Sequence, residues 1–593
     1  MIEKINYVFS KTEKIKFVGI LFLMIIGSLL ELLGVSVFLP FIEGLVAPNE
    51  MQQRDHLKSL YNMFHFNSTE EFLLAFGIAI CVVYIGKNLY LIFMHNTMLN
   101  FSYKTRMKLA TRLLTTYMLE PYSFHLNRNI AVLQRTLQID TTQFMQLING
   151  VLQVLAELAV VVCLGLYLFI TSPTISIVMM GMVGVCILFF SLVSKKVAKR
   201  IGRQNEEYNA QLFQWVNQSL GGIKDVKVLN RENYFIDSYR GVYKKLIKGA
   251  KNCEMLALIP RYTVETMCIV GMIIAVIGKI FFGVRDLNAF VVQMSAFAVA
   301  SFRLMPSVGK INAFINNIMY NLPSFELIYQ DLKDIEDMED AEKLRNSDNY
   351  RISDKDKAPK WNLESKIELK NIVYSYNEDS GKVLDMVDMD IHKGETVALI
   401  GSSGAGKTTM ADVLLGLLIP QNGSILVDGK NIYENMDSWH TMLGYIPQSI
   451  YLSDDTIRNN IAFGIREDDI DDKAIEEALK QAQLYDFVMS LEDGVNTFVG
   501  DRGVRLSGGQ RQRIGIARAL YYDPEILVLD EATSALDNET ETAVMEAIDG
   551  LRGVKTMVII AHRLTTIRNA DTIYEIADGK AIKRSKEDVF SEN

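Results

Sequence analysis

The chain of 593 residues contains little cysteine and little charge. None of its five cysteines stands in a Cys-x-x-Cys pair, so the sequence predicts neither a disulfide framework nor a zinc site. Charged residues make up only 22% of the chain, and the mean hydropathy is +0.14. These values exclude a disordered, a collagen-like and a purely soluble chain, and they predict segments that lie in a membrane.

The second half of the chain lacks positive net charge. Residues 331–593 carry a net charge of −20, whereas residues 1–330 carry +11. The acidic half excludes nucleic acid as a partner, because phosphate is repelled where no basic face exists. The basic half is also the apolar half, which is typical of a membrane protein whose cytoplasmic side faces anionic lipids. An apolar run over 17–46 follows four lysines but is too long for a signal peptide, so we expect a retained anchor.

Six segments of the first half are long and apolar enough to cross a membrane. They are residues 17–46, 72–94, 144–170, 174–194, 255–283 and 289–318. The long gaps after the second and fourth spans are rich in Lys and Arg, which predicts that both lie in the cytoplasm. Their helical pattern predicts two hairpins that turn near 121–122 and 221–222. For residues 57–66 two interpretations stay open, an amphipathic helix on the outer membrane surface or a plain loop.

The second half has the pattern of an α/β domain. Residues 1–330 form the predicted transmembrane domain, and the acidic stretch 331–367 is predicted to be a solvated linker. From 368 to 593, short β-branched runs alternate with helical stretches. Three of these runs, 397–401, 526–530 and 557–561, are predicted to be buried parallel strands.

A glycine-rich motif follows the first of these strands and opens a helix. It fits the pattern G-x-x-x-x-G-K-[ST], in which glycines let backbone amides surround phosphate groups and the helix N-terminus adds positive potential. Lys407 is predicted to reach the β- and γ-phosphates, and Thr408 to offer its hydroxyl to Mg²⁺. The predicted phosphate-binding residues are Gly401, Ser402, Ser403, Gly404, Ala405, Gly406, Lys407, Thr408 and Thr409.

Two carboxylates follow the apolar run of residues 526–529. Asp530 stands at the predicted strand tip, where it would bind Mg²⁺. Glu531 would orient the attacking water and accept its proton as a general base. ATP and Mg²⁺ are therefore the expected ligands.

Residues 506–510 read Leu-Ser-Gly-Gly-Gln and lie between these two motifs. With GSSGAGKTT and ILVLDEATSALD, this sequence resembles the ATP-binding cassette (ABC) superfamily over residues 368–582. The resemblance implies that the motif of one copy contacts the ATP of another, so that two domains enclose two nucleotides. The motif residues concerned are Ser507, Gly508, Gly509 and Gln510.

The resemblance also implies roles for single residues. Gln448 would sense Mg²⁺ and couple the ATPase to the membrane region, and His562 would contact the γ-phosphate. Asp537 would lie at the dimer contact. Tyr376 would stack on adenine, with Tyr374 as the competing candidate on the other strand face. Glu531, His562, Lys407 and Gln448 are thus the expected catalytic residues.

Six spans followed by an ATPase on one chain resemble the exporter-type ABC half-transporters. The expected fold is a polytopic helical membrane domain fused to an α/β P-loop ATPase domain. The resemblance implies a homodimer in the cell inner membrane, with the ATPase domains in the cytoplasm. It also implies that the hairpin tips, near 120–127 and 222–229, act as coupling helices that dock on the ATPase domains.

Ionisable residues inside membrane spans are costly and therefore indicate function. The sequence places seven there: Glu31, Lys87, Glu157, Arg261, Glu265, Arg303 and Lys310. Two interpretations stay open. Lys87, Arg261 and Arg303 could line a basic cavity for an anionic head group, or the charges could pair structurally, as Arg261 and Glu265 could at i,i+4.

Segments 31–41, 260–265 and 303–306 are similar to the bacterial flippases of lipid-linked oligosaccharides in protein N-glycosylation. The resemblance implies an ATP-driven flippase that moves such a glycolipid to the outer side of the membrane. Lys87 stands where the resemblance implies Arg, which weakens bidentate phosphate recognition. The alternatives are an exporter of another cargo (a drug, a peptide or a lipid A-like lipid) and an ATP-gated channel or regulator. The intact Glu531 and His562 argue against the channel.

Overall fold

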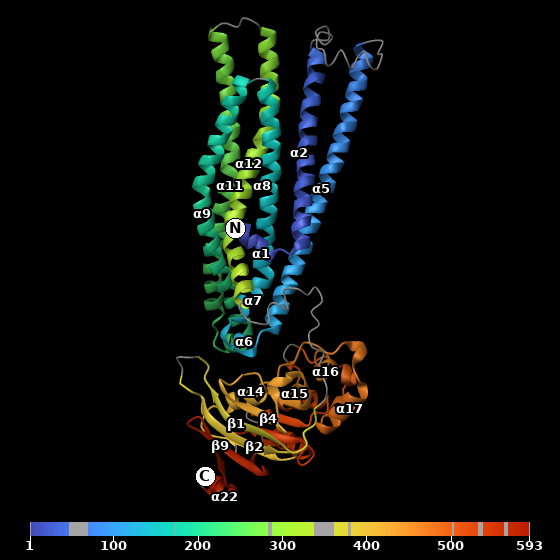
Figure 1. The fold of residues 1–593 in the computed structure, drawn as a ribbon, viewed down its shortest axis with the longest axis vertical. Coiled ribbons are helices and arrows are strands. Elements are labelled where there is room, and N and C mark those ends of the chain that lie inside the picture. The colour runs from blue at the N-terminus through green and yellow to red at the C-terminus, as the bar shows by residue number, and fades with distance from the viewer. Residues whose placement is uncertain are drawn as a thin grey trace. The chain divides into compact units, whose positions relative to one another are not determined.

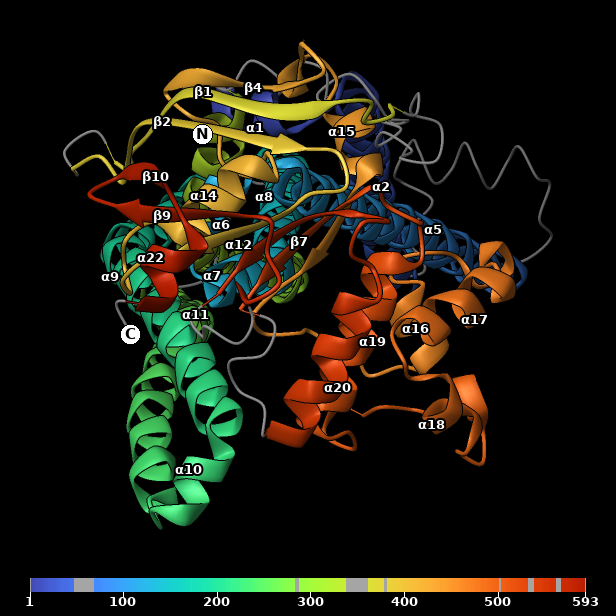
Figure 2. The same ribbon diagram turned by 90° about the horizontal axis from the view of Figure 1, so that it is seen from below.

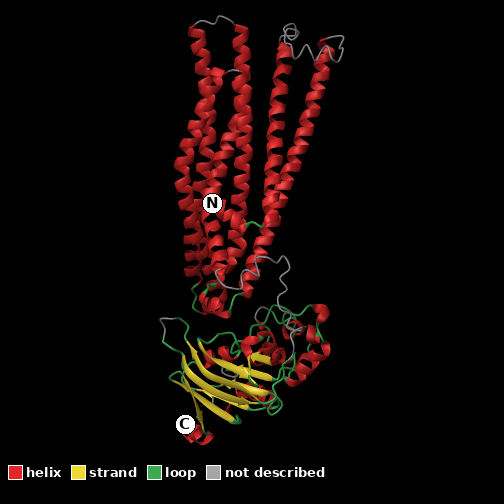
Figure 3. Ribbon diagram, viewed as in Figure 1, coloured by secondary structure: helices red, strands yellow, loops and turns green. Residues whose placement is uncertain are grey.

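The computed structural model describes residues 2–46, 69–171, 173–282, 287–336, 361–377, 381–500, 503–531, 538–561 and 567–591. The chain divides into two compact units. The N-terminal unit comprises residues 1–120 and 127–347, and the C-terminal unit comprises residues 121–126 and 348–593. The first unit is helical and the second is α/β, which confirms the predicted fold class (Figures 1 and 3).

Long helices build the N-terminal unit, and each covers one of the six predicted spans, with residue 283 of the fifth span outside the described residues. They are α2 (Lys11–Val46), α5 (Thr69–Leu119), α8 (Thr141–Thr171), α9 (Pro173–Gly221), α11 (Glu232–Phe282) and α12 (Leu287–Glu336). Helices α5 and α11 have 51 residues each. At 1.5 Å per residue they are about 76 Å long, so they extend well beyond a hydrocarbon core of about 30 Å.

Within the described residues, three segments are long and apolar enough to cross a membrane by length and composition. They are Lys11–Gly34, Glu70–Leu119 and Ile130–Cys163. These segments overlap the first three predicted spans.

Helix α12 is the centre of the N-terminal unit, since it packs against α8, α9 and α11, while α2 pairs with α5 (Figure 1). Phe144 of α8 and Phe325 of α12 are fully buried and stack with their ring centroids 5.5 Å apart. Gly202 of α9 lies against the Tyr320 backbone, because a Cβ at this glycine would be 2.2 Å from the Tyr320 carbonyl oxygen. The helices therefore pack closely, backbone against backbone in places.

Short helices form the tips of the two long hairpins, as the sequence predicts. The tips are α6 (Tyr122–Asn127) and α10 (Ile223–Val228). Figure 2 shows α10 at the end of the hairpin between α9 and α11. Two further short elements, α7 (Ile130–Arg135) and the π-helix η1 (Thr136–Asp140), lead into α8, and α1 (Ile2–Val8) precedes α2.

The predicted linker over 331–367 differs from the structure at both ends. Helix α12 continues to Glu336, because Asp331 accepts a 3.0 Å hydrogen bond from the Tyr117 hydroxyl and Leu332 is buried. Strand β1 already begins at Lys366. The remainder, 337–360, and the segment 57–66 lie outside the described residues.

The C-terminal unit contains two sheets. The antiparallel sheet has the order β2-β1-β4-β5, with β1 (Lys366–Tyr374), β2 (Leu384–His392), β4 (Asn422–Val427) and β5 (Lys430–Asn431). The larger sheet has the order β10-β9-β3-β8-β7-β6 and is parallel except for β10. Its strands are β3 (Thr396–Ile400), β6 (Leu443–Ile446), β7 (Ile526–Asp530), β8 (Thr556–Ile560), β9 (Thr572–Ala577) and β10 (Lys580–Arg584). The three predicted buried parallel strands are thus confirmed as β3, β7 and β8.

Alternate residues of the parallel strands belong to two different cores. In β7, Ile526 and Val528 pack with helix α14 (Lys407–Leu414) and the antiparallel sheet, whereas Leu527 and Leu529 pack with helix α19 (Gly508–Leu520). Since successive side chains of a strand point to opposite faces, α14 and α19 lie on opposite faces of this sheet. The other helices are α15 (Met436–Met442), α16 (Ile457–Ile461), α17 (Asp472–Gln481), α18 (Tyr485–Met489), α20 (Asn538–Asp549) and α22 (Lys586–Ser591).

Candidate functional site

The glycine-rich loop connects β3 to α14 through a left-handed backbone. Gly401, Gly404 and Gly406 have φ angles of +142°, +82° and +104°. A Cβ at Gly401 would lie 2.3 Å from the Ile576 carbonyl oxygen, so a larger residue would need the backbone to shift. A loop of this kind can turn successive N–H groups toward one anion, and it ends at the N-terminus of α14, where the helix dipole favours negative charge.

Lys407 is buried at the start of α14 and folds back over this loop. Its ammonium donates to the carbonyl oxygens of Gly401 and Ser402, both at 2.9 Å. Burial lowers the pKa of the Lys407 ammonium, while the carboxylates of Glu531 and Asp530 act in the opposite direction. The cation is therefore held at the loop, directly beside the two predicted acidic residues.

The acidic pair stands at the end of β7. Asp530 is buried and ends the strand, and Glu531 follows with a left-handed φ of +47° and donates its N–H to the Ile560 carbonyl. Gln448 follows the neighbouring strand β6, and its side-chain Nε2 donates to Glu531 Oε2 at 2.5 Å. The two residues are 83 positions apart in sequence but meet because β6 and β7 are parallel neighbours whose carboxyl ends lie at the same edge.

Asp412 is a further acidic residue of this region that the sequence analysis missed. It is buried on α14, and burial together with the nearby Asp530 raises the pKa of its carboxyl to about 6. The available signal was a carboxylate inside the apolar run of residues 410–415, because an acid on the buried face of a helix is costly.

The aromatic residues before the loop occupy different environments. Tyr374 is 5% exposed, whereas Tyr376 is 46% exposed. The Tyr376 hydroxyl lies 2.9 Å from the Thr409 hydroxyl oxygen, which ties this ring to α14. Of the two candidates, Tyr376 is the one whose ring a base can reach.

The Leu-Ser-Gly-Gly-Gln motif forms the N-terminus of α19. Ser507 caps this helix in a reciprocal pair: its Oγ accepts from the Gln510 N–H at 3.2 Å, and its own N–H donates to Gln510 Oε1 at 2.8 Å. Ser507 and Gly508 are exposed and Gly509 is buried. Because α19 and α14 lie on opposite faces of the sheet, the motif offers an exposed helix N-terminus on the face away from the P-loop helix.

The residues of the site fit a nucleotide with Mg²⁺. The loop supplies a glycine cradle and a cation for phosphate oxygens, and the exposed Thr408 and the carboxylate of Asp530 supply the oxygen ligands that Mg²⁺ prefers. His562 and Asp537 lie outside the described residues, so their roles stay predictions.

The predicted cavity residues of the membrane unit have other surroundings. The Lys87 ammonium is buried, lies 3.7 Å from the Glu31 carboxylate and sits 4.7 Å from the centroid of the Tyr84 ring. Arg261 is exposed, and its side chain approaches Gly309. The Arg303 side chain lies outside the described part of the chain. For Lys87, this geometry favours the structural-pairing interpretation over the basic cavity.

A second lysine of the spans also has a carboxylate partner. Lys310 of α12 donates to Glu157 of α8 at 2.7 Å.

Two family models match the chain. Residues 17–253 match the ABC transporter transmembrane region, and residues 384–534 match the ABC transporter model. The first match covers α2, α5, α8 and α9 of the helical bundle, and the second covers the glycine-rich loop, Gln448, Ser507–Gln510, Asp530 and Glu531.

Several curated relatives are named ATP-dependent lipid A-core flippase. The protein of Cupriavidus metallidurans is 30% identical over 81% of this chain and 78% of its own length. The protein of Saccharophagus degradans is 33% identical over 68% of this chain and 64% of its own length. A solved structure of a bacterial Atm1-family ABC exporter with ATP bound matches 98% of this chain and 96% of its own, with a TM-score of 0.74 and 21% identity. At that identity the structural match shows the fold alone.

Proposed function

Because this chain belongs to the exporter-type half-transporters of the ABC family, which hydrolyse ATP to drive transport, we propose that it flips a lipid A-like anionic lipid. The direction would be from the cytoplasmic to the outer side of the cell inner membrane. The carrying observation is the similarity to lipid A-core flippases over about four fifths of the chain. These relatives favour the lipid A-like cargo, which the sequence analysis held as an alternative, over a lipid-linked oligosaccharide.

The active form is a homodimer in this proposal. The homodimer is supported by the positions of the glycine-rich loop and of the Leu-Ser-Gly-Gly-Gln motif, the two halves of a nucleotide site, within one chain. The P-loop helix α14 and the helix α19 pack on opposite faces of the same sheet, and the exposed Ser507 and Gly508 begin α19. A second copy that presents Ser507–Gln510 to the loop of residues 401–408 would complete each site, as the family resemblance implies.

Hydrolysis then rests on residues at the edge of the sheet. The loop and Lys407 bind the phosphates, while Thr408, Asp530 and Gln448 would hold Mg²⁺, which would supply charge neutralisation when bound. Glu531 accepts the proton of the attacking water, and the 2.5 Å hydrogen bond from Gln448 positions its carboxylate. Tyr376 stacks on the base and His562 contacts the terminal phosphate.

A reconstituted transport assay tests the proposal. The full chain is placed in proteoliposomes with a fluorescent lipid A analogue, a lipid-linked oligosaccharide or a neutral lipid. We expect ATP-dependent movement of the lipid A analogue, lost in Glu531→Gln, and ATPase activity that this lipid stimulates. If only the lipid-linked oligosaccharide stimulates ATPase activity and is flipped, the cargo is that glycolipid and not a lipid A-like lipid. Full hydrolysis by an isolated single copy would overturn the dimer.

A further inference from the structure

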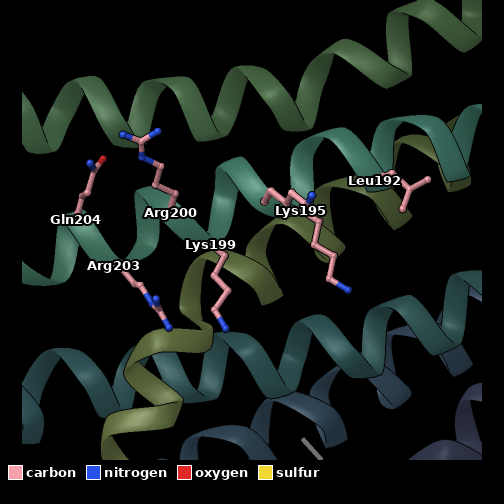
Figure 4. Close-up of a pocket in the computed structure, with 7 residues that line it drawn as sticks. Leu192, Lys195, Lys199, Arg200, Arg203 and Gln204 are labelled. Carbon is pink, nitrogen blue, oxygen red and sulfur yellow. The ribbon is translucent and has the colours of Figure 1, made fainter.

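A basic cavity lies on α9, directly after the predicted membrane span 174–194. Its volume is about 550 Å³, and it is open to the outside, because most of the residues that line it are exposed. Five cations within nine residues line it: Lys195, Lys196, Lys199, Arg200 and Arg203. Figure 4 shows Lys199 and Arg203 extending to one side of the helix and Arg200 to the other. None of these residues belongs to the nucleotide site or to the predicted cargo cavity.

Negative charge compensates only part of this cluster. Glu326 of α12 lies 3.1 Å from the Lys199 ammonium and 3.8 Å from the Arg203 guanidinium, and Arg203 also interacts electrostatically with Glu206. Within the ranges that the structure describes, no carboxylate forms an ion pair with Lys195, Lys196 or Arg200. The cavity therefore keeps a strong positive charge that an anion would neutralise.

An apolar surface adjoins the cations along the same helix. Val185, Leu188, Phe189, Leu192 and Val193 are each more than half exposed. Leu192 also lines the cavity, so the apolar surface and the charged surface are continuous. The α9 backbone beside the cavity is held in place, because α9 packs directly on α12 at Gly202.

From this juxtaposition we propose that the α9 cavity binds the phosphate headgroup of an anionic phospholipid of the cytoplasmic leaflet. All the residues that line the cavity belong to α9, and clusters of Lys and Arg that directly follow a membrane helix on the cytoplasmic side are suited to anionic lipid headgroups. The exposed apolar side chains would contact the acyl chains, while the cations beyond the span contact the phosphate. The apolar half of the surface favours a lipid over a free phosphate, which would use the cations alone. The site is separate from cargo transport and holds a lipid of the surrounding membrane.

Counting the lipids bound to the purified full-length protein tests this site. Native mass spectrometry would follow binding of phosphatidylglycerol and, in parallel, of phosphatidylcholine. We expect phosphatidylglycerol to bind more tightly. The variant Lys195→Gln/Lys196→Gln/Arg200→Gln should lower its affinity about 10-fold or more, because each lysine or arginine near the surface attracts anionic lipid. The charge-preserving variant Lys195→Arg/Lys196→Arg should retain binding.

A matched control separates the cavity from the general positive charge of the cytoplasmic side. Lys11→Gln/Lys14→Gln/Lys16→Gln removes the same charge at the start of α2, outside the cavity. Equal losses in both triple variants would overturn the proposal in favour of non-specific attraction. If inorganic phosphate at equal concentration displaces the lipid, the ligand of the cavity is a free phosphate and not a lipid. If the cavity variant no longer forms a dimer but binds lipid as before, the surface is a contact with the partner subunit and the proposal is wrong. Lipid counting requires no transport, so its outcome is distinguishable from failure of the proposed cargo.

Discussion

The two units of the chain use charge in different ways. In the C-terminal unit, ionisable and polar side chains from distant segments converge on one edge of a sheet. Lys407 follows β3, Gln448 follows β6, and Asp530 and Glu531 end β7. Three parallel strands end at the same edge, so the fold brings together a cation, two acids and an amide that a nucleotide with Mg²⁺ requires.

In the N-terminal unit, charges of the predicted spans pair with one another. Lys87 lies beside Glu31, and Lys310 beside Glu157. Such pairing reduces the cost of placing a charge in a membrane, and it occupies Lys87, one of the three cations predicted for the cargo cavity. The comparison teaches that charges which converge on one sheet edge of the ATPase unit indicate chemistry, whereas a charge in a span first has to be tested for a partner. The α9 cavity differs because its cations outnumber the neighbouring carboxylate.

Glu531→Gln should give the largest effect and tests the chemistry of the ATPase unit. Loss of a general base costs about 100-fold or more in turnover, while the amide keeps the shape needed to bind ATP. Steady-state ATPase activity and equilibrium nucleotide binding measure the two quantities. Glu587→Gln, an exposed change on α22, serves as the control. If the ATP turnover of the variant stays within a few-fold of the unchanged protein, Glu531 is not the general base.

Gly401→Ala tests whether the loop geometry, rather than its charge, makes the site. The added Cβ would meet the Ile576 carbonyl oxygen at 2.3 Å, in a left-handed conformation. Strain of about 1–3 kcal/mol corresponds to roughly 10-fold weaker ATP binding or more. Gly429→Ala is the matched control, because its φ is +83° and nothing lies within 4 Å of the added Cβ. Equal effects of both variants on ATP affinity would contradict this account.

The nucleotide site could be predicted from the sequence because its chemistry fixes residue types at fixed spacings. The left-handed Gly401 is a requirement of the backbone geometry, and the carboxylate at the tip of β7 directly follows an apolar strand, so both leave local patterns. The hairpin tips α6 and α10 were predictable for a similar reason, since Pro121 and the pair Gly221–Gly222 interrupt long helical patterns there.

Contacts between elements that are distant in sequence could not be predicted. The Lys87–Glu31 pair joins α5 to α2, and its existence depends on how those helices pack. The Tyr117–Asp331 hydrogen bond, which continues α12 into the predicted linker, depends on a contact across 214 positions. Asp412 left a local signal, but only the position of Asp530 explains its raised pKa. Packing decides such features, and no local pattern encodes it.

Lys87→Met tests whether Lys87 stabilises the membrane unit or binds cargo. Removing one partner of a buried pair costs about 3 kcal/mol or more, because the other charge is left uncompensated. We therefore expect a lower Tm for Lys87→Met and for Glu31→Gln. The double variant should cost less than the sum of the single variants, since partners in contact are coupled.

Thermal unfolding of the detergent-solubilised protein measures these values, with cargo-stimulated ATPase activity as a second readout. An unchanged Tm for Lys87→Met, together with lost stimulation by the cargo, would restore the basic-cavity interpretation. The claim that charges in the spans serve structural pairing would then be wrong for Lys87.

Glu206→Gln gives the smallest expected effect and tests a largely buried acid in the part of α9 that follows the predicted span. Burial first, and then the nearby Asp140, raise the pKa of Glu206 from 4.5 to about 7, while Arg135 and Arg203 act in the opposite direction. A folded-state pKa above the unfolded value means that the folded protein binds the extra proton. Stability from this group is therefore present below pH 4.5 and is lost as the pH rises through about 7.

The Gln variant lacks this loss, so its Tm should match the unchanged protein near pH 5 and exceed it at pH 8. The full pKa change corresponds to about 3 kcal/mol. The variant also loses the Glu206 contact with the buried Arg135, at 4.0 Å, so we expect a net gain below that value. Thermal unfolding between pH 5 and pH 8 measures the difference. Glu207→Gln removes an exposed carboxylate at the next position and should show no such rise. If the Tm of both variants changes with pH in the same way, the partial burial of Glu206 does not affect the pH dependence of stability. The negative charge alone would then explain the result.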